Sequence, residues 1–326
     1  MRVLVTGGSS LIGAGVARCL AERGDSVVCL QRSRSESLDE RIDQQLGDLR
    51  DAEAVEAAAR GCDGIVHVAA KVGVVGDWEE YRAINVEGTE HVMAAADRHD
   101  VERVVYVSSP SVAHGGEPIV GGGAEPPVFG RRRAWYAESK AMAEVTALAA
   151  ASPERGVVAI RPHLVWGPAD TQLVGRIVDR ARSGRLALVG GGRALVDTTY
   201  IDNAVDALVA ALDAAHPGAV CSGRAYVVAN GEPRTIRELV EGICTAAGVP
   251  FAPREVSLRA GRLAGAVVER VWPVVRPGEE PPLTEFLAEQ LGTAHWFDPR
   301  PARDDLGWTP TVGIDEGLRR LAEWYH

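Results

Sequence analysis

Short runs of apolar residues that alternate with helical patterns constrain the fold of this chain more than any other feature. The runs lie in the first half of the sequence, at 3–5, 27–30, 65–69, 104–107 and 157–160. Between them, apolar residues recur every three or four positions in 12–23, 52–60, 78–98 and 135–151. Continuous apolar runs are typical of strands buried on both faces, and helical crossovers make such strands parallel. The pattern therefore predicts an α/β fold, with a doubly wound parallel sheet of the Rossmann type.

The second half of the chain has a looser pattern. A turn of three glycines at 190–192 precedes a predicted helix at 203–213, a strand at 225–228 and a helix at 235–247. We expect a first domain over 1–162, with later strands returning to it around 196–229, and a smaller interleaved lobe over 163–326. The segment 121–133 begins with three glycines and is predicted to be a mobile loop.

Composition excludes several classes of protein. The 326 residues carry a net charge of −10, which disfavours nucleic acid as a partner. Five scattered cysteines without a Cys-x-x-Cys pair indicate free thiols in a reducing cytoplasm, and the histidines follow no zinc motif, so no metal site is expected. We find neither a signal-peptide pattern nor 18 consecutive apolar residues, so no membrane span is predicted.

A glycine-rich turn follows the first predicted strand and opens the first helix. Its sequence is Thr6-Gly7-Gly8-Ser9-Ser10-Leu11-Ile12-Gly13, and backbone N–H groups in such a turn bind a pyrophosphate. Gly7 would form the tight turn, and Gly13 would allow close helix packing. Ser10 occupies a position that is usually glycine, so either the phosphate lies farther out or the hydroxyl donates to it. The first domain is therefore predicted to bind a dinucleotide, and the second lobe the substrate.

The end of the second strand favours NADP(H) over NAD(H). An acid that would accept from the ribose 2′-hydroxyl is absent there, and Arg32, Ser33 and Arg34 stand where a 2′-phosphate would lie. The alternative is that these arginines are solvated loop charges. Asp48, after the third strand, is placed to accept from the adenine amino group, or it caps the helix that begins near residue 52.

Tyr136 and Lys140 are four residues apart, which places them on one face of a helix. The chain has only two lysines among its 35 basic residues, so a lysine at this spacing calls for a specific explanation. An ammonium beside a phenol favours the ionised phenol and tunes it for proton transfer to or from a carbonyl or carbinol oxygen. Ser108 and Ser109 close the strand at 104–107, where a hydroxyl could bond the same oxygen or simply form a turn.

Together these residues resemble the extended short-chain dehydrogenase/reductase family over essentially the whole chain. Further matching motifs are Ala69-Ala70, Asn85-Val86-x-Gly88-Thr89, Arg161-Pro162, Gly167-Pro168 and Leu306-Gly307-Trp308-x-Pro310. The resemblance implies a catalytic tetrad of Asn85, Ser109, Tyr136 and Lys140. Ser109 is implied rather than Ser108 because the family's active hydroxyl lies three positions before a valine, here Val112. It also implies a homodimer and a set of cofactor-binding residues: Gly7, Ser9, Ser10, Leu11, Ile12, Gly13, Arg32, Ser33, Asp48, Leu49, Ala69, Ala70, Tyr136, Lys140 and Pro162.

Within that family the chain looks like the 3β-hydroxysteroid dehydrogenase branch, and in it like bacterial 2-alkyl-3-oxoalkanoate reductases. The segments that carry this narrower resemblance are 67–76, 108–112, 161–168 and 295–298. It implies NADP(H)-dependent reduction of a 3-oxo group on a 2-alkyl fatty acid. A 3β-hydroxysteroid or sterol dehydrogenase, a sugar-nucleotide epimerase or dehydratase that retains NAD, and a non-catalytic dinucleotide-binding regulator are the alternatives. Lys71 and His163 could touch the cofactor or substrate, but packing or capping roles fit them equally well.

An apolar stripe with helical spacing covers 258–275. It consists of Leu258, Leu263, Ala264, Val267, Val268, Val271, Trp272, Val274 and Val275. Such a stripe is either a core helix of the second lobe or the wall of a lipid groove. With Trp166, it would suit an apolar substrate tail better than a sugar nucleotide, which requires polar groups.

Overall fold

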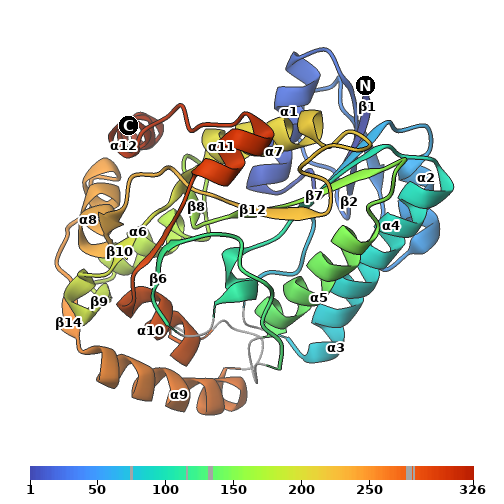
Figure 1. Cartoon of the computed structure of the whole chain (residues 1–326). Helices are drawn as coiled ribbons and strands as arrows, with labels where there is room; N and C mark the ends of the chain where they lie inside the picture. The colour runs from blue at the N-terminus through green and yellow to red at the C-terminus, as the bar shows by residue number, and fades with distance from the viewer. Residues whose placement is uncertain (74–75, 115–116, 131–134, 277–280, 282) are drawn as a thin grey trace.

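The chain is built around one seven-stranded parallel sheet (Figure 1). The structure, a computed structural model, describes residues 1–326 except 74–75, 115–116, 131–134, 277–280 and 282. The strand order is β12-β7-β5-β4-β1-β2-β3. The strands are β1 (Arg2–Thr6), β2 (Ser26–Gln31), β3 (Asp43–Leu46), β4 (Gly64–His67), β5 (Arg103–Val107), β7 (Gly156–Pro162) and β12 (Arg224–Val228). All five predicted apolar runs form strands of this sheet, which confirms the fold class.

Helices cover both faces of the sheet, as the doubly wound pattern predicts (Figure 1). One face packs against α1 (Leu11–Glu22) and α7 (Ile201–Ala214), and the other against α2 (Ala52–Ala59), α4 (Gly88–Arg98) and α5 (Trp135–Ala149). Successive residues of β1 belong to different cores: Val3 and Val5 pack on the α1 side, and Leu4 on the α2 side. This alternation is why a strand buried on both faces is apolar along most of its length.

The predicted helix at 78–98 forms with an irregularity in its middle. It consists of α3 (Trp78–Tyr81), a π-helical turn η1 (Arg82–Glu87) and α4. Such wide turns are often found at functional sites. Here the turn contains Asn85.

The second lobe contains small sheets and several helices, and one strand of its largest sheet, β6, comes from within residues 1–162. Its four-stranded sheet has the order β13 (Arg234–Thr235), β10 (Leu195–Val196), β15 (His295–Phe297) and β6 (Ile119–Gly122). Two further strand pairs are β8 (Val165–Trp166) with β11 (Thr199–Tyr200), and β9 (Ala187–Val189) with β14 (Arg254–Val256). The remaining elements are the 3-10 turns η2 (Pro110–Ala113) and η3 (Gly190–Gly192), and the helices α6 (Val174–Arg182), α8 (Ile236–Ala246), α9 (Leu258–Val275), α10 (Glu285–Gly292), α11 (Arg300–Leu306) and α12 (Ile314–Tyr325).

The prediction of a mobile loop over 121–133 is wrong for its first two residues. Gly121 and Gly122 lie in β6, which pairs with β15, a strand more than 170 residues away in the sequence. That distant pairing supplies hydrogen bonds that local glycine content does not reveal. The end of the predicted loop, 131–134, lies outside the described residues.

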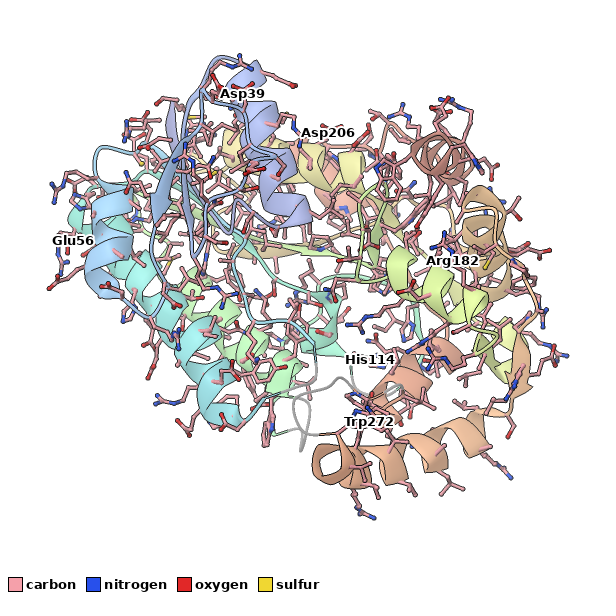
Figure 2. All side chains as sticks on the ribbon, turned by 180° about the vertical axis from the view of Figure 1, so that it is seen from behind. Asp39, Glu56, His114, Arg182, Asp206 and Trp272 are labelled. Atoms are coloured by element: carbon pink, nitrogen blue, oxygen red, sulfur yellow. The ribbon has the colours of Figure 1, made fainter. Side chains whose placement is uncertain are left out.

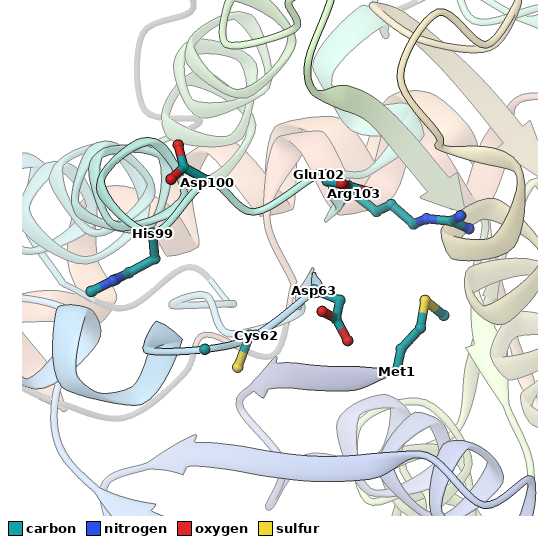
Figure 3. A pocket seen from close by; sticks show the side chains of 8 residues that line it. Met1, Cys62, Asp63, His99, Asp100, Glu102 and Arg103 are labelled. Atoms are coloured by element: carbon teal, nitrogen blue, oxygen red, sulfur yellow. The ribbon is translucent and has the colours of Figure 1, made fainter.

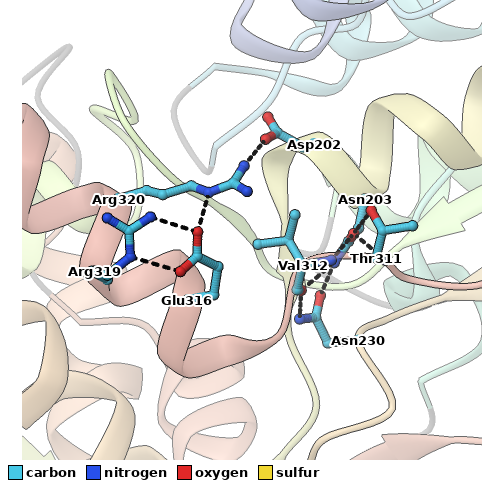
Figure 4. Close-up of polar contacts among 8 residues, drawn as sticks. All are labelled: Asp202, Asn203, Asn230, Thr311, Val312, Glu316, Arg319 and Arg320. Atoms are coloured by element: carbon cyan, nitrogen blue, oxygen red, sulfur yellow. Dashed lines mark hydrogen bonds and ion pairs between the residues drawn. The ribbon is translucent and has the colours of Figure 1, made fainter.

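A buried amide pair connects the C-terminal segment to the sheet domain (Figure 4). Asn203 on α7 donates to Val312 O at 2.7 Å and accepts from Thr311 N at 2.9 Å. Asn230, which follows β12, donates to the same Val312 carbonyl at 2.8 Å. Because buried amides need partners, these bonds fix the path of the chain after α11.

Candidate active site

The predicted site residues gather at the carboxyl edge of the sheet. Because the strands are parallel, the segments after β1, β2, β4, β5 and β7 all emerge at this edge. They contain the glycine-rich turn, Arg32, Ala69, Ser109 and His163 respectively. The strand order reverses between β1 and β4, which is where open α/β sheets bind ligands.

The glycine-rich turn has the close approaches that a phosphate-binding turn requires. Gly7 has φ +73°, and a Cβ there would lie 2.9 Å from the Ala69 Cα. A Cβ on Gly13 would lie 2.2 Å from the Gly7 carbonyl oxygen, so both positions need glycine. Ser10 is the N-cap of α1: its hydroxyl donates to Gly7 O at 2.8 Å and accepts from Gly13 N at 3.1 Å. The turn and the N-terminus of α1 therefore fit a dinucleotide pyrophosphate.

Arg32 and Asp48 lie near each other on the adenosine side of the edge. Arg32 is exposed after β2, and its charge contributes to lowering the pKa of Asp48. A larger contribution comes from Arg50, whose Nε and Nη2 donate to the Asp48 carboxylate at 2.9 and 2.7 Å. Asp48 is therefore an ion-paired carboxylate, and the predicted contact with adenine would have to share it with Arg50.

Ser109, Tyr136 and Lys140 meet at the end of β5. The buried Lys140 Nζ donates to Val107 O at 2.5 Å and lies 4.1 Å from the ring centre of Tyr106. Burial raises the pKa of Tyr136, and a hydrogen bond with Ser109 opposes that shift. Burial also lowers the pKa of Lys140 to about 7. For Tyr136 burial outweighs the hydrogen bond with Ser109, so the net shift of the phenol pKa is upward, whereas the sequence predicted a downward shift.

Asn85 is fixed by three hydrogen bonds that join η1 to α5. Its Oδ1 accepts from Lys71 N at 2.7 Å, and its Nδ2 donates to Lys71 O at 3.0 Å and to Ser139 Oγ at 2.9 Å. Ser139 Oγ in turn donates to Tyr136 O at 2.9 Å. The amide therefore connects the segment after β4 to the helix that bears Tyr136 and Lys140.

Sequence reasoning missed His67, which links Thr6, at the start of the glycine-rich turn, to Thr89 in α4. Its Nδ1 lies 2.7 Å from Thr6 Oγ1, and its Nε2 lies 3.0 Å from Thr89 Oγ1. Ala69 N also donates to Thr6 Oγ1, at 3.1 Å. Burial, reinforced by Lys140, lowers the pKa of His67 to about 3, so this imidazole is neutral at physiological pH.

Sequence reasoning also missed the partner of Arg161. The guanidinium bonds the Glu144 carboxylate through Nε at 2.7 Å and Nη2 at 2.5 Å, and both side chains are 1% exposed. It also donates to Glu125 O at 2.8 Å. Glu144 is on α5 and Arg161 is on β7, so no local spacing indicated this pair.

Three buried imidazoles lie where the sheet domain meets the second lobe. The rings of His114 and His295 are 4.8 Å apart, and those of His295 and His163 are 6.0 Å apart. His163 follows β7 and bonds Asp197 O through Nδ1, and burial lowers its pKa to about 4. Figure 2, which shows the molecule from behind, places His114 between the sheet domain and the lobe. His163 therefore has a structural bond and also faces the cavity described next.

An apolar cavity of about 180 Å³ lies in the second lobe. His163, Trp166, Thr198 and His295 form part of its lining. The rest comes mainly from α6, β9, α8 and α10, with apolar side chains that include Ile177, Leu188, Val240, Ile243, Leu287 and Leu291. Arg176 and Arg180 on α6 add two cationic groups to the wall. The cavity can accept an apolar group of a molecule bound near the end of β7.

A second hollow, of about 360 Å³, lies at the opposite edge of the sheet (Figure 3). Its lining includes Met1, Cys62, Asp63 and His99, which precede strands, and Arg103, the first residue of β5. Parallel α/β sheets bind ligands at the carboxyl edge, and none of the predicted catalytic residues lies here. The carboxyl edge is therefore the candidate for the active site.

The apolar stripe of 258–275 forms the predicted helix, α9, but neither expected role fits its outer face. Leu263, Val267, Val271 and Val275 are between 49% and 71% exposed, so they are not core residues. The described residues that line the cavity include none from α9. α10, which packs beside α9, supplies the cavity wall instead.

Among the described residues, no group of three or more His, Cys, Asp or Glu side chains is arranged to hold a metal ion. In the same part of the chain, every helix is too short or too polar to cross a bilayer.

The fold and this constellation define an NAD(P)-dependent oxidoreductase that acts on a CH–OH or C=O group. Residues 4–258 match the model of the 3-beta hydroxysteroid dehydrogenase/isomerase family, and the chain belongs to that family. The chain is 47% identical to a 2-alkyl-3-oxoalkanoate reductase of Stenotrophomonas maltophilia over 324 residues, which cover 98% of each protein. It is 32% identical over 337 residues to a 3-beta-hydroxysteroid dehydrogenase of Mycolicibacterium neoaurum, covering 99% of this chain and 91% of the relative.

The fold also matches solved structures. The Bordetella bronchiseptica enzyme WbmH, in complex with NAD+, superposes with a TM-score of 0.73 at 23% identity, covering 99% of this chain and 97% of that one. At that identity the match concerns the fold.

Proposed function

We propose that the chain is an NADP(H)-dependent reductase of a 3-oxo group on a 2-alkyl-3-oxoalkanoate. The observation that carries the proposal is the apolar cavity that starts beside His163, the residue after β7, on the same sheet edge as Tyr136. A tail in this cavity gains about 0.8 kcal/mol for each buried methylene. The names of relatives such as the Stenotrophomonas maltophilia protein support the same substrate class.

The chemistry is a balanced addition of hydride and proton across the carbonyl. The dinucleotide, when bound, supplies the hydride to the carbonyl carbon. The Tyr136 phenol donates its proton to the carbonyl oxygen, and the Ser109 hydroxyl donates a hydrogen bond to that oxygen. The remaining phenolate favours the protonated form of Lys140, one helical turn away. Lys140 would also hold the ribose hydroxyls, and Asn85 would order the proton relay.

The preference for NADP(H) rests on Arg32. This side chain is exposed beyond β2 and is flanked by Ser33 and Arg34, both exposed. A guanidinium binds phosphate through two parallel hydrogen bonds, whereas an acid in this place would repel it.

Two further properties belong to the proposal. We infer a homodimer, as the family resemblance implies, and sedimentation analysis would test it. We also infer residence in a reducing cytoplasm, supported by five free cysteines, four of them buried.

A chain-length series tests the proposed substrate class. The ratio kcat/KM for 3-oxo acids should rise with tail length, by up to about fourfold per methylene, until the cavity is filled. Val240→Phe should narrow the cavity and reduce kcat/KM for long tails while leaving short ones unchanged. Val220→Phe, at a residue 67% exposed, is the matched control. A flat profile would argue against the proposal.

The family's description and the Mycolicibacterium neoaurum relative favour a 3-oxosteroid as the second candidate. An enzyme built for a rigid steroid ring system would show no rise in kcat/KM with each added methylene of the 3-oxo acids. The same series therefore separates the two substrate classes. A sugar-nucleotide epimerase or dehydratase, the third alternative, would leave the apolar cavity without a ligand group.

A further inference from the structure

Leu164 has a backbone conformation that leucine rarely adopts. Its φ is +44°, in the left-handed region, where a Cβ crowds the following carbonyl oxygen. In the described part of the chain, the other residues besides glycine with such a φ are Asp100 and Ala169. Aspartate is enriched in this region and alanine has the smallest side chain, so the conflict between backbone and side chain is greatest at Leu164.

Hydrogen bonds on both sides of Leu164 fix this conformation. On one side, His163 N donates to Val228 O at 3.1 Å, and the His163 carbonyl accepts from Thr199 Oγ1 at 2.8 Å. On the other side, Leu164 O accepts from Thr199 N at 3.3 Å, and β8, which begins at Val165, pairs with β11. Strained residues persist where the surroundings fix them in this way, and they are concentrated at functional sites.

The Leu164 side chain lies where the apolar cavity opens. It lines this cavity and is 37% exposed, whereas its neighbours on the wall, His163, Trp166 and Thr198, are 7%, 1% and 3% exposed. Leu164 also follows the end of β7 by two residues, at the carboxyl edge of the sheet. A molecule whose ketone lies at that edge therefore passes Leu164 where its tail enters the cavity.

We propose that Leu164 is a specificity-determining residue, whose side chain contacts the first methylenes of an apolar substrate tail at the entrance of the cavity. The inference rests on the proposed reduction of a 3-oxo acid with such a tail. Glycine or asparagine would form the turn from β7 to β8 at less cost, because both adopt a positive φ more readily than leucine. The isobutyl group supplies what they lack, an apolar surface against which methylenes are buried.

Packing of the second lobe is the other role that a leucine can have. Leu188 and Ile243 on the same cavity wall are 2% and 3% exposed, so they are packing residues. Leu164 leaves more than a third of its side chain accessible, and its contribution to the core is correspondingly smaller. A substitution that fits the backbone but is polar therefore separates the two roles.

Two variants of Leu164 are compared with the wild type. Leu164→Asn fits the left-handed conformation but removes the apolar group. Leu164→Met retains an apolar group of similar volume in the strained conformation. Ala169→Asn is the matched control, because Ala169 has φ +64°, is exposed and is not among the described residues that line the cavity.

Reduction of long and short 3-oxo acids by the NADPH-saturated enzyme tests the proposal. For a long-chain acid, kcat/KM should fall at least about tenfold in Leu164→Asn, equivalent to about two methylene contacts, and stay within about twofold in Leu164→Met. Reduction of 3-oxobutanoate, which has no tail, should be the same in all variants. The midpoint of thermal unfolding of Leu164→Asn should stay within about 2 °C of the wild type, because the relaxed backbone offsets the lost contacts. Ala169→Asn should leave every kcat/KM unchanged.

The proposal is overturned if Leu164→Asn keeps the wild-type kcat/KM for the long acid, or if Leu164→Met loses as much as Leu164→Asn. It is also overturned if Leu164→Asn lowers the thermal midpoint and the reduction of 3-oxobutanoate together, since Leu164 would then be a packing residue.

Calorimetric titration of the NADP⁺-bound protein with dodecanoate, which has no 3-oxo group, repeats the comparison without turnover. Dodecanoate should bind the wild type and Leu164→Met alike, and Leu164→Asn more weakly. Equal binding by all three proteins, or no binding by the wild type, would contradict the proposal. If dodecanoate binding differs as expected while no protein reduces a 3-oxo acid, the proposed function fails and the role of Leu164 as an apolar contact is retained.

Discussion

In the proposed mechanism Tyr136 bears the proton that the reaction consumes, and its substitution gives the most direct residue-scale prediction. Tyr136→Phe retains the ring but removes the proton, so we expect kcat to fall by roughly 10²-fold or more with the fold intact. Tyr226→Phe, which removes a hydroxyl bonded to Asp305 at 2.6 Å, is the matched control. Near-normal turnover in steady-state assays of Tyr136→Phe would refute the assignment.

Arg32 determines the predicted choice of cofactor. Arg32→Asp replaces attraction by repulsion near the 2′-phosphate, so NADPH binding should weaken by about 1–3 kcal/mol and NADH binding should improve. Fluorescence titration with both dinucleotides measures the effect. Arg18→Asp, an exposed change of the same charge on α1, should not alter the ratio. A wild type that prefers NADH would show that Arg32 is only a solvated charge.

Lys140 makes stability depend on pH. Its pKa falls from 10.5 to about 7 on burial, so between these values the unfolded chain binds a proton that the folded chain does not. Stability from this group therefore increases as pH rises through that window, and is lost as pH falls toward 7. In denaturant unfolding between pH 6 and 9, the free energy of unfolding of the wild type should increase with pH. The Lys140→Met variant should lack this increase. If the free energy of unfolding depended on pH in the same way in both proteins, the buried position of the Lys140 ammonium would be contradicted.

At the scale of elements, the ion pair between Arg161 and Glu144 holds the end of β7 against α5. Glu144→Gln would leave a buried guanidinium without a counter-charge, and we expect about 3–5 kcal/mol of destabilisation in denaturant unfolding. The partly exposed pair of Arg98 and Glu56 provides the control, since Glu56→Gln should cost about 0–1 kcal/mol. Equal costs for the two variants would contradict this account.

Sequence patterns predicted the central strands because strands buried on both faces are mostly apolar. They did not predict β6, which is short and is defined by pairing with a distant segment. They predicted the helix α9 but not which side of it is covered. Gly261 and Gly265 allow α10 to approach closely, so the glycine side became the buried one and the valines were left outside.

In the candidate site, too, features that are local in the sequence were predicted and features that depend on distant contacts were not. The spacing of Tyr136 and Lys140, and the glycine-rich turn, were recognisable because each is local in sequence. The effect of burial on Lys140 and the chain of contacts through His67 depend on packing among distant strands. Such effects are set by the assembled interior and leave little trace in any one segment.

At the scale of the whole molecule, we propose that the two halves have separate tasks. The sheet domain offers a phosphate-binding turn and a proton donor at one edge, and the second lobe offers an apolar cavity beside that edge. The central claim is that these meet in one active site that reduces a ketone on an apolar acid.

A side-by-side assay tests that claim most directly. The purified protein is given NADPH with a long-chain 2-alkyl-3-oxo acid, a 3-oxosteroid or a UDP-sugar, and both NADPH loss and product are measured. The account predicts the highest kcat/KM on the 2-alkyl-3-oxo acid, with stoichiometric formation of the 3-hydroxy acid. Higher activity on the UDP-sugar than on either apolar ketone would contradict it.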